Sequence, residues 1–314
     1  MWPAPGAHAK KPRTGMNKHF TRIALVGKVE DTRVADSIAE LATHLRGRGL
    51  TVLLDRDASV EGLPDGLVRK PLAELGREAD LIVAIGGDGT LLFAAQLALD
   101  RGVPLVGVNR GRLGFLTDVL PGEMIADLDA VLEGRYETDA RELLAARLIR
   151  AGGRALDCRA LNDVVVQRQE SGRMVELEVR IDGNFVNVHG GDGIVIASST
   201  GSTAYALSCG GPIIHPSLGA VVIAPISPHT LSDRPIVMPR GSRIEIRLVE
   251  RSGMRAQVTC DSFRLGDLEA GSRLEIGPAG ERITLLHPPG HDYFRLLRSK
   301  LHWGRGGRPE DEDR

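Results

Sequence analysis

Two patterns of apolar and polar positions alternate along the first third of the chain. Short continuous apolar runs, typical of buried strands, lie at residues 21–28, 50–55, 79–87 and 103–109. Apolar residues at helical spacing fill residues 34–45, and a second helix is predicted from Thr90 to about Asp100. Buried strands that alternate with helices predict a parallel, Rossmann-like sheet with helices on both faces.

The pattern changes after residue 118, and from Arg141 the chain consists of short strands in which every second position is apolar. Residues 175–181 follow this period of two, and the Asp182-Gly183 pair after them predicts a tight hairpin turn. Residues 200–212 interrupt the strands with a short helix. This part of the chain is therefore predicted to be an all-β sandwich.

Residues 293–301 return to helical spacing and predict a tail helix that packs back on the α/β domain. Proline, glycine and charged residues dominate both ends of the chain, as is typical of disordered segments. The predicted divisions are a disordered arm over residues 1–19, an α/β domain over 20–118, a β-sandwich over 119–288, the tail helix over 289–304 and a disordered end over 305–314.

The amino-acid composition excludes several classes of function but says little about the fold. The 314 residues carry a formal net charge of −1 and only 4% aromatic side chains, which argues against a nucleic-acid surface. No apolar run is long enough to span a membrane. The three separated cysteines, Cys158, Cys209 and Cys260, favour neither a disulfide framework nor a zinc site. We therefore expect a cytoplasmic protein without nucleic-acid or membrane partners.

The sequence IGGDGT (residues 85–90) lies where a predicted buried strand meets a predicted helix. The carboxyl end of a parallel strand is where open α/β sheets bind ligands. Glycine lets the backbone approach a phosphate closely, and the following helix offers free N–H groups and its positive dipole end. The stretch has neither the lysine of a P-loop nor the spacing of a dinucleotide fingerprint, so it indicates a different kind of phosphate-binding turn.

Asp88 is the unexpected member of this turn, because a carboxylate repels phosphates. It could cap the helix, bind a metal ion or accept a proton from an attacking hydroxyl. A tight turn closed by a capping aspartate explains the local sequence equally well, so the local sequence leaves these alternatives open.

Three later segments also carry groups suited to a nucleotide. Residues 108–118, VNRGRLGFLTD, follow a strand and suit either the same cleft or a glycine-rich linker. The side chains of Asn162 and Asp163 can bind ribose hydroxyls or a carboxamide, although Asn-Asp is also a common turn pair. Residues 191–216 place Asp192 between glycines and then crowd hydroxyls into one loop, which suits a phosphate or ribose as well as an ordinary serine-rich loop.

His287 and His291 are four residues apart, but the sequence Pro-Pro-Gly between them prevents one helical face from presenting both. No cluster of acids or histidines has the sequence spacing of a metal site. We therefore predict no metal held by the protein alone and expect Mg²⁺, or another divalent ion, to arrive with a nucleotide.

Taken together, these segments resemble the NAD kinase family. The shared stretches occur in the family's order and are GGDGT (86–90), NRGRLGFL (109–116), LNDVV (161–165), GDGIVIASSTGSTAYALSCGGPI (191–213) and IAPISPHTLSDRPIV (223–237). GGDGT alone is less specific, because lipid kinases of the diacylglycerol and sphingosine type and 6-phosphofructokinases carry similar sequences. The longer stretches GSTAYALS and NRGRLGFL make the resemblance specific.

The resemblance implies an amino-terminal α/β domain, a carboxy-terminal β-sandwich and an active site between them. It implies ATP-dependent phosphorylation of the adenosine-ribose 2′-hydroxyl of NAD, which gives NADP, by a homodimer or homotetramer. Asp88 would be the catalytic residue that accepts the proton of that hydroxyl. The implied nucleotide-binding residues are Gly86, Gly87, Asp88, Gly89, Asn162, Asp163, Arg173, Asp192, Thr203, Ala204, Tyr205, Ala206, Leu207 and Ser208.

Four positions depart from the family pattern. Asp163 stands where relatives usually have Glu, which keeps the charge but shortens the reach of the side chain. Phe93 replaces a frequent Arg or His, Phe263 a polar residue that contacts NAD in some relatives, and Ser199 a usual proline. None of these changes removes Asp88. They could change the affinity for the substrate or the preference between NAD and NADH.

Two other functions share parts of this pattern. A diacylglycerol- or sphingosine-type lipid kinase would use the same glycine turn, but the sequence has no basic amphipathic segment for a membrane surface. A non-catalytic NAD-sensing module would use Asn162 and Asp163 without needing Asp88 as a base. The intact Asp88 therefore favours an ATP-dependent NAD kinase.

Overall fold

The computed structural model of the chain describes residues 20–111, 114–169, 174–249 and 254–303. The predicted arm, the predicted end and Arg173 lie outside these residues. The described residues form two compact units: unit 1 comprises those between 20 and 140 and between 284 and 303, and unit 2 comprises those between 141 and 283. None of the described helices combines the length and the apolar character needed to cross a membrane.

Unit 1 contains the predicted parallel sheet. Its strand order is β17–β5–β4–β1–β2–β3, and neighbouring strands are parallel. The strands are β1 (Arg22–Gly27), β2 (Thr51–Asp55), β3 (Val68–Lys70), β4 (Leu81–Gly86), β5 (Leu105–Asn109) and the end of β17 (Arg273–His287). The helices are α1 (Thr32–Gly47), α2 (Leu72–Glu78), α3 (Asp88–Ala98), α4 (Met124–Leu132) and α6 (Tyr293–Leu301).

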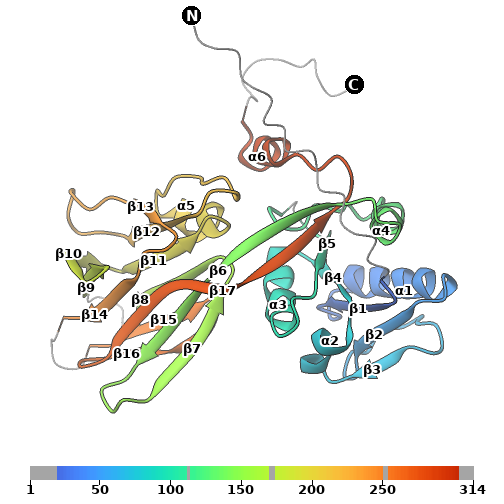
Figure 1. Cartoon of the computed structure of the whole chain (residues 1–314), viewed down its shortest axis with the longest axis horizontal. Helices are drawn as coiled ribbons and strands as arrows, with labels where there is room; N and C mark the ends of the chain where they lie inside the picture. The colour runs from blue at the N-terminus through green and yellow to red at the C-terminus, as the bar shows by residue number, and fades with distance from the viewer. Residues whose placement is uncertain (1–19, 112–113, 170–173, 250–253, 304–314) are drawn as a thin grey trace, which may run out of the picture. The chain divides into compact units, whose positions relative to one another are not determined.

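Helices cover both faces of this sheet, as the apolar pattern predicts (Figure 1). Strand β5 shows how the two faces differ. Val106 and Val108 belong to a core shared with α1 and α4, whereas Gly107 between them faces Leu91 of α3. A Cβ on Gly107 would lie 2.7 Å from a methyl group of Leu91, so glycine allows α3 to approach the strand closely.

Unit 2 is a sandwich of two antiparallel sheets. One sheet has the order β13–β12–β11–β8–β15–β16, and the other contains β10–β9–β14–β17 together with β6 and β7. The strands are β6 (Glu137–Ile149), β7 (Ala155–Ala160), β8 (Asp163–Arg168), β9 (Val175–Ile181), β10 (Asn184–Gly191), β11 (Gly193–Ser198), β12 (Ala220–Ile226), β13 (Ile236–Pro239), β14 (Ile244–Leu248), β15 (Ala256–Cys260) and β16 (Phe263–Leu268). Alternate side chains of both sheets form one core between them.

Two local predictions for unit 2 are confirmed. Asp182 and Gly183 have φ angles of 51° and 82° and join β9 to β10 as the predicted hairpin turn. The predicted helical interruption consists of a 3-10 turn, η1 (Gly201–Thr203), and a short helix, α5 (Tyr205–Ser208). Ala206 of α5 packs on the outer face of the six-stranded sheet.

A helix and a disulfide of the structure differ from the expectations. Unit 1 contains α4, where no helix is predicted. The domain limits at residues 118 and 288 stay predictions. Cys158 of β7 and Cys260 of β15 form a disulfide across 102 residues of sequence. The expectation of no disulfide is therefore wrong for this pair, while Cys209 is free.

The tail helix α6 belongs to unit 1. Leu296 and Leu297 are buried, and the ammonium of Lys300 lies 5.5 Å from the centre of the Phe115 ring. Asp292 caps the helix by accepting a hydrogen bond from the Phe294 N–H at 2.8 Å. These contacts attach the tail to the segment that follows β5.

Asp118, His287 and His291 form a hydrogen-bonded group just before this helix. Burial alone would raise the pKa of Asp118, but hydrogen bonds from His287 and His291 outweigh burial and lower it below its ordinary value. Burial alone would lower the pKa of His287, but its carboxylate neighbours Asp118 and Asp139 raise it to about 9. In the absence of other ligands, the group is therefore an ion-pair network.

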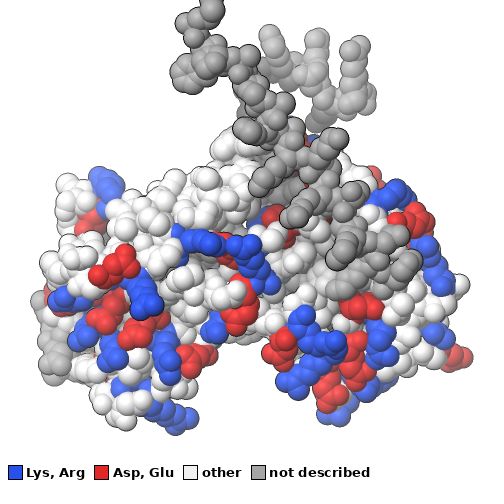
Figure 2. Space-filling model, in the orientation of Figure 1, with Lys and Arg blue, Asp and Glu red and all other residues white. Residues whose placement is uncertain are grey.

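Acidic and basic side chains are interspersed over the surface. Figure 2 shows this mixture on the face of each unit that is in view. Several of these side chains are paired, as are Arg22 with Glu78 and Arg264 with Asp267. Such pairing neutralises charge locally, in line with the formal net charge of −1.

Candidate active site

The glycine turn joins β4 to α3 at the carboxyl edge of the parallel sheet. Gly86 has a φ of 155°, and a Cβ there would lie 2.9 Å from the Cβ of Thr90, so only glycine fits. Gly87 is the N-cap of α3, and no other atom of the described residues lies within 4 Å of the Cβ position of either Gly87 or Gly89. This side of the turn therefore leaves room for a ligand at the first N–H groups of the helix.

Asp88 is the first residue of α3 and does not cap it. Its Oδ2 accepts a hydrogen bond from the Phe115 N–H at 2.8 Å, and its Oδ1 accepts from the N–H groups of Leu116 at 3.0 Å and Thr117 at 3.3 Å. The Thr117 hydroxyl also donates to Oδ1, at 3.3 Å. Oδ2 accepts one of these hydrogen bonds and retains capacity to accept another.

The segment after β5 is folded against Asp88 and is not a linker. Asn109 Oδ1 accepts from the Gly111 N–H at 2.8 Å, and Asn109 Nδ2 donates to the Thr117 hydroxyl at 3.1 Å. A Cβ on Gly114 would lie 2.7 Å from Asp88 Cγ, so this glycine permits the close approach of the loop. Asp88 and the described part of residues 108–118 therefore form one hydrogen-bonded unit.

A cavity of about 390 Å³ lies beside the glycine turn within unit 1. Gly89, Thr90 and Phe93 line it from α3, and Lys28 and Asp55 line it from the ends of β1 and β2. This volume is within the range of small-molecule sites. Phe93 therefore gives the cavity an aromatic wall, at the position where the resemblance would lead one to expect Arg or His.

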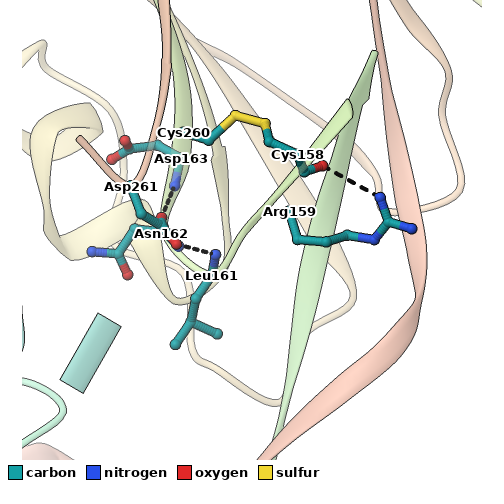
Figure 3. Close-up of a disulfide and its surroundings, with 7 residues drawn as sticks. All are labelled: Cys158, Arg159, Leu161, Asn162, Asp163, Cys260 and Asp261. Carbon is teal, nitrogen blue, oxygen red and sulfur yellow. Dashed lines mark hydrogen bonds between the residues drawn. A yellow bond between two sulfur atoms is a disulfide. The ribbon is translucent and has the colours of Figure 1, made fainter. Parts of the chain in front are cut away.

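In unit 2, Asp261 fixes the Asn162-Asp163 pair (Figure 3). Its carboxylate accepts the N–H groups of Leu161 at 2.6 Å, Asn162 at 2.7 Å and Asp163 at 3.2 Å. Asn162 Oδ1 is buried and has no hydrogen-bond partner among the described residues. Because a buried acceptor without a donor costs free energy, this oxygen marks a position for a ligand donor.

Two buried carboxyl groups meet at this pair. Asp163 is 7% exposed and Asp261 is 4% exposed. Burial and the charge of Asp261 raise the pKa of Asp163 from 3.8 to about 7. Burial also raises the pKa of Asp261, although the three backbone N–H donors counteract it. Near neutral pH, Asp163 therefore exists in both protonated and ionised forms.

The hydroxyl-rich loop lies directly against the Asn162-Asp163 pair. The Ser198 N–H donates to the Asn162 carbonyl at 2.8 Å, and a Cβ on Gly201 would lie 2.8 Å from the Asn162 Cα. Ser202 is fully buried, and its hydroxyl oxygen accepts from the Ile214 N–H at 2.9 Å. Ser202 thus supports the loop and is not exposed to a ligand.

The structure gathers several predicted residues of unit 2 around this loop. Burial raises the pKa of Tyr205, and the charges of Cys209, Asp192 and Asp163 raise it further. Asp192 also forms an ion pair with Arg168 at 2.6 Å. The other residues predicted here, Thr203, Ala204, Ala206, Leu207 and Ser208, lie in or between η1 and α5.

Asp261 and Arg168 are structural partners of the site that the sequence did not indicate. Asp261 lies 98 to 100 residues from the three N–H groups it binds. Arg168 ends β8, 24 positions before its partner Asp192. Neither residue belongs to a short motif, so only the folded chain shows these pairings.

A glycine turn beside a cavity, together with a buried acid-amide pair in a β-sandwich, defines a nucleotide-binding protein of two units. Comparison with family models identifies residues 26–136 as an ATP-NAD kinase N-terminal domain and residues 161–287 as an ATP-NAD kinase C-terminal domain. The chain belongs to the NAD kinase family.

Individual relatives agree with this assignment. The chain is 44% identical over 289 residues to the NAD kinase of Aromatoleum aromaticum, covering 92% of this chain and 96% of that one. It is 45% identical over 289 residues to the NAD kinase of Methylococcus capsulatus, covering 92% of this chain and 99% of that one.

Solved structures show the same fold. The crystal structure of yeast NADH kinase complexed with NADH matches with a TM-score of 0.86 at 24% identity, over 94% of this chain and 91% of that one. The NAD kinase from Archaeoglobus fulgidus in complex with ATP matches with a TM-score of 0.70 at 26% identity, over 90% of this chain and 98% of that one. These matches confirm the predicted combination of an α/β unit and a β-sandwich.

Proposed function

We propose that the protein is an NAD kinase that transfers the γ-phosphoryl group of ATP to the adenosine-ribose 2′-hydroxyl of NAD and forms NADP. The observation that carries this proposal is the position of Asp88, whose carboxylate is fixed at the start of α3 with acceptor capacity left on Oδ2. A phosphate-binding turn alone would not need this acid, but transfer to a hydroxyl does.

Unit 1 would bind ATP as its magnesium complex. Gly86, Gly87 and Gly89 would let the phosphates approach the backbone, and the start of α3 would stabilise their charge. The oxygen of the 2′-hydroxyl would form a bond to the γ-phosphorus as the bond to the bridging oxygen of ADP breaks. Asp88 Oδ2 would accept the hydroxyl proton during this step.

The magnesium ion would be held by the nucleotide and not by the glycine turn. Asp88 already accepts four hydrogen bonds from residues 115–117. The only group of metal-ligating side chains found among the described residues lies elsewhere, at Asp118, His287 and His291. Mg²⁺ therefore enters the proposal as part of the substrate MgATP.

Unit 2 would recognise NAD. Asn162 Oδ1 would accept a hydrogen bond from an N–H or O–H group of the substrate, and Asp163 would bind a ribose hydroxyl. Asp192 and residues 203–208 would bind the nucleoside portion, and Arg173 a phosphate. We also propose the homodimer or homotetramer and the cytoplasmic location that the family resemblance implies.

Activity can be tested directly on the full chain. We expect incubation with ATP, Mg²⁺ and NAD to yield NADP, detected with an NADP-specific dehydrogenase, and labelled ATP to leave diacylglycerol and sphingosine unlabelled. Label in the lipid and not in NAD would assign the protein to the lipid kinases. Saturable NAD binding without any NADP would instead identify a sensing module and overturn the proposal.

Replacing Asp163 with asparagine tests the raised pKa of this carboxyl group. The pKa of Asp163 is about 7 in the folded state and ordinarily 3.8, so the folded state binds this proton more tightly than the unfolded state. The resulting stabilisation is complete below pH 3.8 and is lost as the pH rises through 7. This difference corresponds to at most about 4 kcal/mol in the free energy of unfolding. We therefore expect Asp163→Asn to melt higher, relative to wild type, at pH 8 than at pH 5.

The same variant tests binding, and Asp157 of β7 provides the control. We expect Asp163→Asn to raise the KM for NAD. We also expect the KM of this variant to stay constant between pH 6 and 8, because the ionising group is gone. Asp157 is exposed, so Asp157→Asn should keep the wild-type pH dependence of melting and of KM. Identical pH profiles for Asp163→Asn and wild type would contradict this role of Asp163.

A further inference from the structure

Three potential metal ligands from distant parts of the sequence meet within unit 1. Asp118 follows the loop after β5, His287 ends β17, and His291 lies just before α6. Asp118 Oδ2 is 2.7 Å from Nδ1 of His287 and 2.7 Å from Nδ1 of His291. One ligand atom from each side chain lies within 4.8 Å of the others. Both imidazoles thus direct the same type of nitrogen at one carboxylate oxygen.

The environment of His287 is that of an oriented metal ligand. The residue is 2% exposed, and its second side-chain nitrogen, Nε2, is buried without a hydrogen-bond partner among the described residues. Asp139 Oδ2 lies 3.7 Å from Nε2, too far for a direct hydrogen bond but close enough to attract an Nε2–H. A carboxylate behind the outer nitrogen commonly orients a histidine whose other nitrogen binds a metal.

An acidic cavity adjoins two of the three side chains. It has a volume of about 500 Å³ and is lined by Asp118 and His291. The other charged residues that line it are Glu123, Asp127, Asp292 and Arg295. Besides Asp118, three acidic residues and one arginine line the cavity. The cavity is therefore negatively charged, which favours a cation. The cavity would also supply water for a coordination position that the protein leaves open.

We propose that Asp118, His287 and His291 bind a divalent transition-metal ion of the Zn²⁺ type. Two imidazole nitrogens and one carboxylate oxygen suit Zn²⁺, whereas Mg²⁺ prefers oxygen ligands alone. Tetrahedral ligands at Zn²⁺ distances are about 3.3 Å apart, so the 2.7 Å separations would widen by about 0.6 Å. This site is separate from the magnesium ion that accompanies ATP.

The ion would fasten the tail of the chain. It would join the segment before α6 to β17 and to the loop after β5, which otherwise meet through hydrogen bonds. Asp118 directly follows Thr117, whose N–H donates to Asp88. Occupancy would therefore stabilise both the tail helix and the loop that positions Asp88.

The test uses the full chain after removal of metals with a chelator. We expect calorimetric titration with Zn²⁺ to show one bound equivalent and a higher melting temperature. Titration with Co²⁺ should give visible bands of a nitrogen- and oxygen-ligated ion, without the thiolate charge-transfer band that binding to Cys209 would produce.

Variants separate this site from ordinary histidine–carboxylate pairs. His291→Ala should weaken Zn²⁺ binding by more than about 100-fold, because loss of an outer partner alone costs about 10–100-fold. Asp139→Asn, which leaves all three ligands, should weaken it within that smaller range. His44 Nε2 lies 2.7 Å from Asp129 Oδ1 in the same unit, so His44→Ala is the matched control and should bind normally.

Two results would overturn the proposal. One is the absence of stoichiometric Zn²⁺ and Co²⁺ binding by the metal-free wild-type protein, which would leave only an ion-pair network. The other is equal binding by wild type and His291→Ala, which would place the ion elsewhere. Neither readout depends on kinase activity, so the proposed function can fail without affecting this inference.

Discussion

Replacing Asp88 with asparagine is expected to lower kcat by about 10²–10⁴-fold, the usual contribution of a positioned proton acceptor. A ribose hydroxyl is a weak nucleophile at neutral pH, and the carboxylate removes its proton as the bond to phosphorus forms. Asp88 Oδ2 is suited to this step because it accepts one hydrogen bond from the described residues, that of the Phe115 N–H, and has capacity for a second. Asparagine keeps the shape but lacks the charge.

The measurement must separate proton transfer from the support that Asp88 gives to the loop. We expect Asp88→Asn to bind ATP and NAD with nearly wild-type affinity in calorimetric titrations, while its melting temperature falls slightly. Thr117→Val is the matched variant, because it removes one donor to Asp88 Oδ1 and leaves the carboxylate. Equal losses of turnover in both variants, or normal turnover in Asp88→Asn, would contradict the role of proton acceptor.

Local patterns predict the elements of this chain well because each pattern has a local physical cause. Strand β4 of unit 1 is buried throughout because both of its faces are covered, and strand β9 of unit 2 alternates because one of its faces lies in the core. Asp182-Gly183 predicts its turn because both residues tolerate the positive φ that the hairpin requires. Helix α4 was missed although Met124, Leu128 and Val131 have helical spacing.

The partners that give the site its chemistry could not be predicted in this way. The donors to Asp88 lie 27 to 29 residues away, and those to Asp261 lie 98 to 100 residues away. The Cys158–Cys260 disulfide and the approach of Asp118 to His287 likewise span more than 100 residues. Such pairings depend on strand order and on loop paths, which residue spacing does not encode. The motifs therefore identify the groups, and the fold assigns their partners.

Replacing Gly114 with alanine is expected to reduce turnover by about 100-fold without removing any functional group. The new methyl group would lie 2.7 Å from Asp88 Cγ and would also crowd the Thr117 hydroxyl. The carboxylate or the loop must then move, and a displacement of about 1 Å in a reacting group can cost about 100-fold in rate. Overpacking of this kind also costs about 1–3 kcal/mol of stability.

Gly122 provides the matched control for this effect. It is an exposed turn residue eight residues further along the same connection, and no other atom in the described part of the chain lies within 4 Å of its Cβ position. We expect Gly122→Ala to keep wild-type kcat and melting temperature in the NADP-forming assay. If Gly114→Ala lowered the melting temperature but kept kcat, the exact position of the Asp88 carboxylate would not limit the reaction. A loss of kcat with unchanged ATP and NAD binding would instead show that the loop acts by positioning this carboxylate.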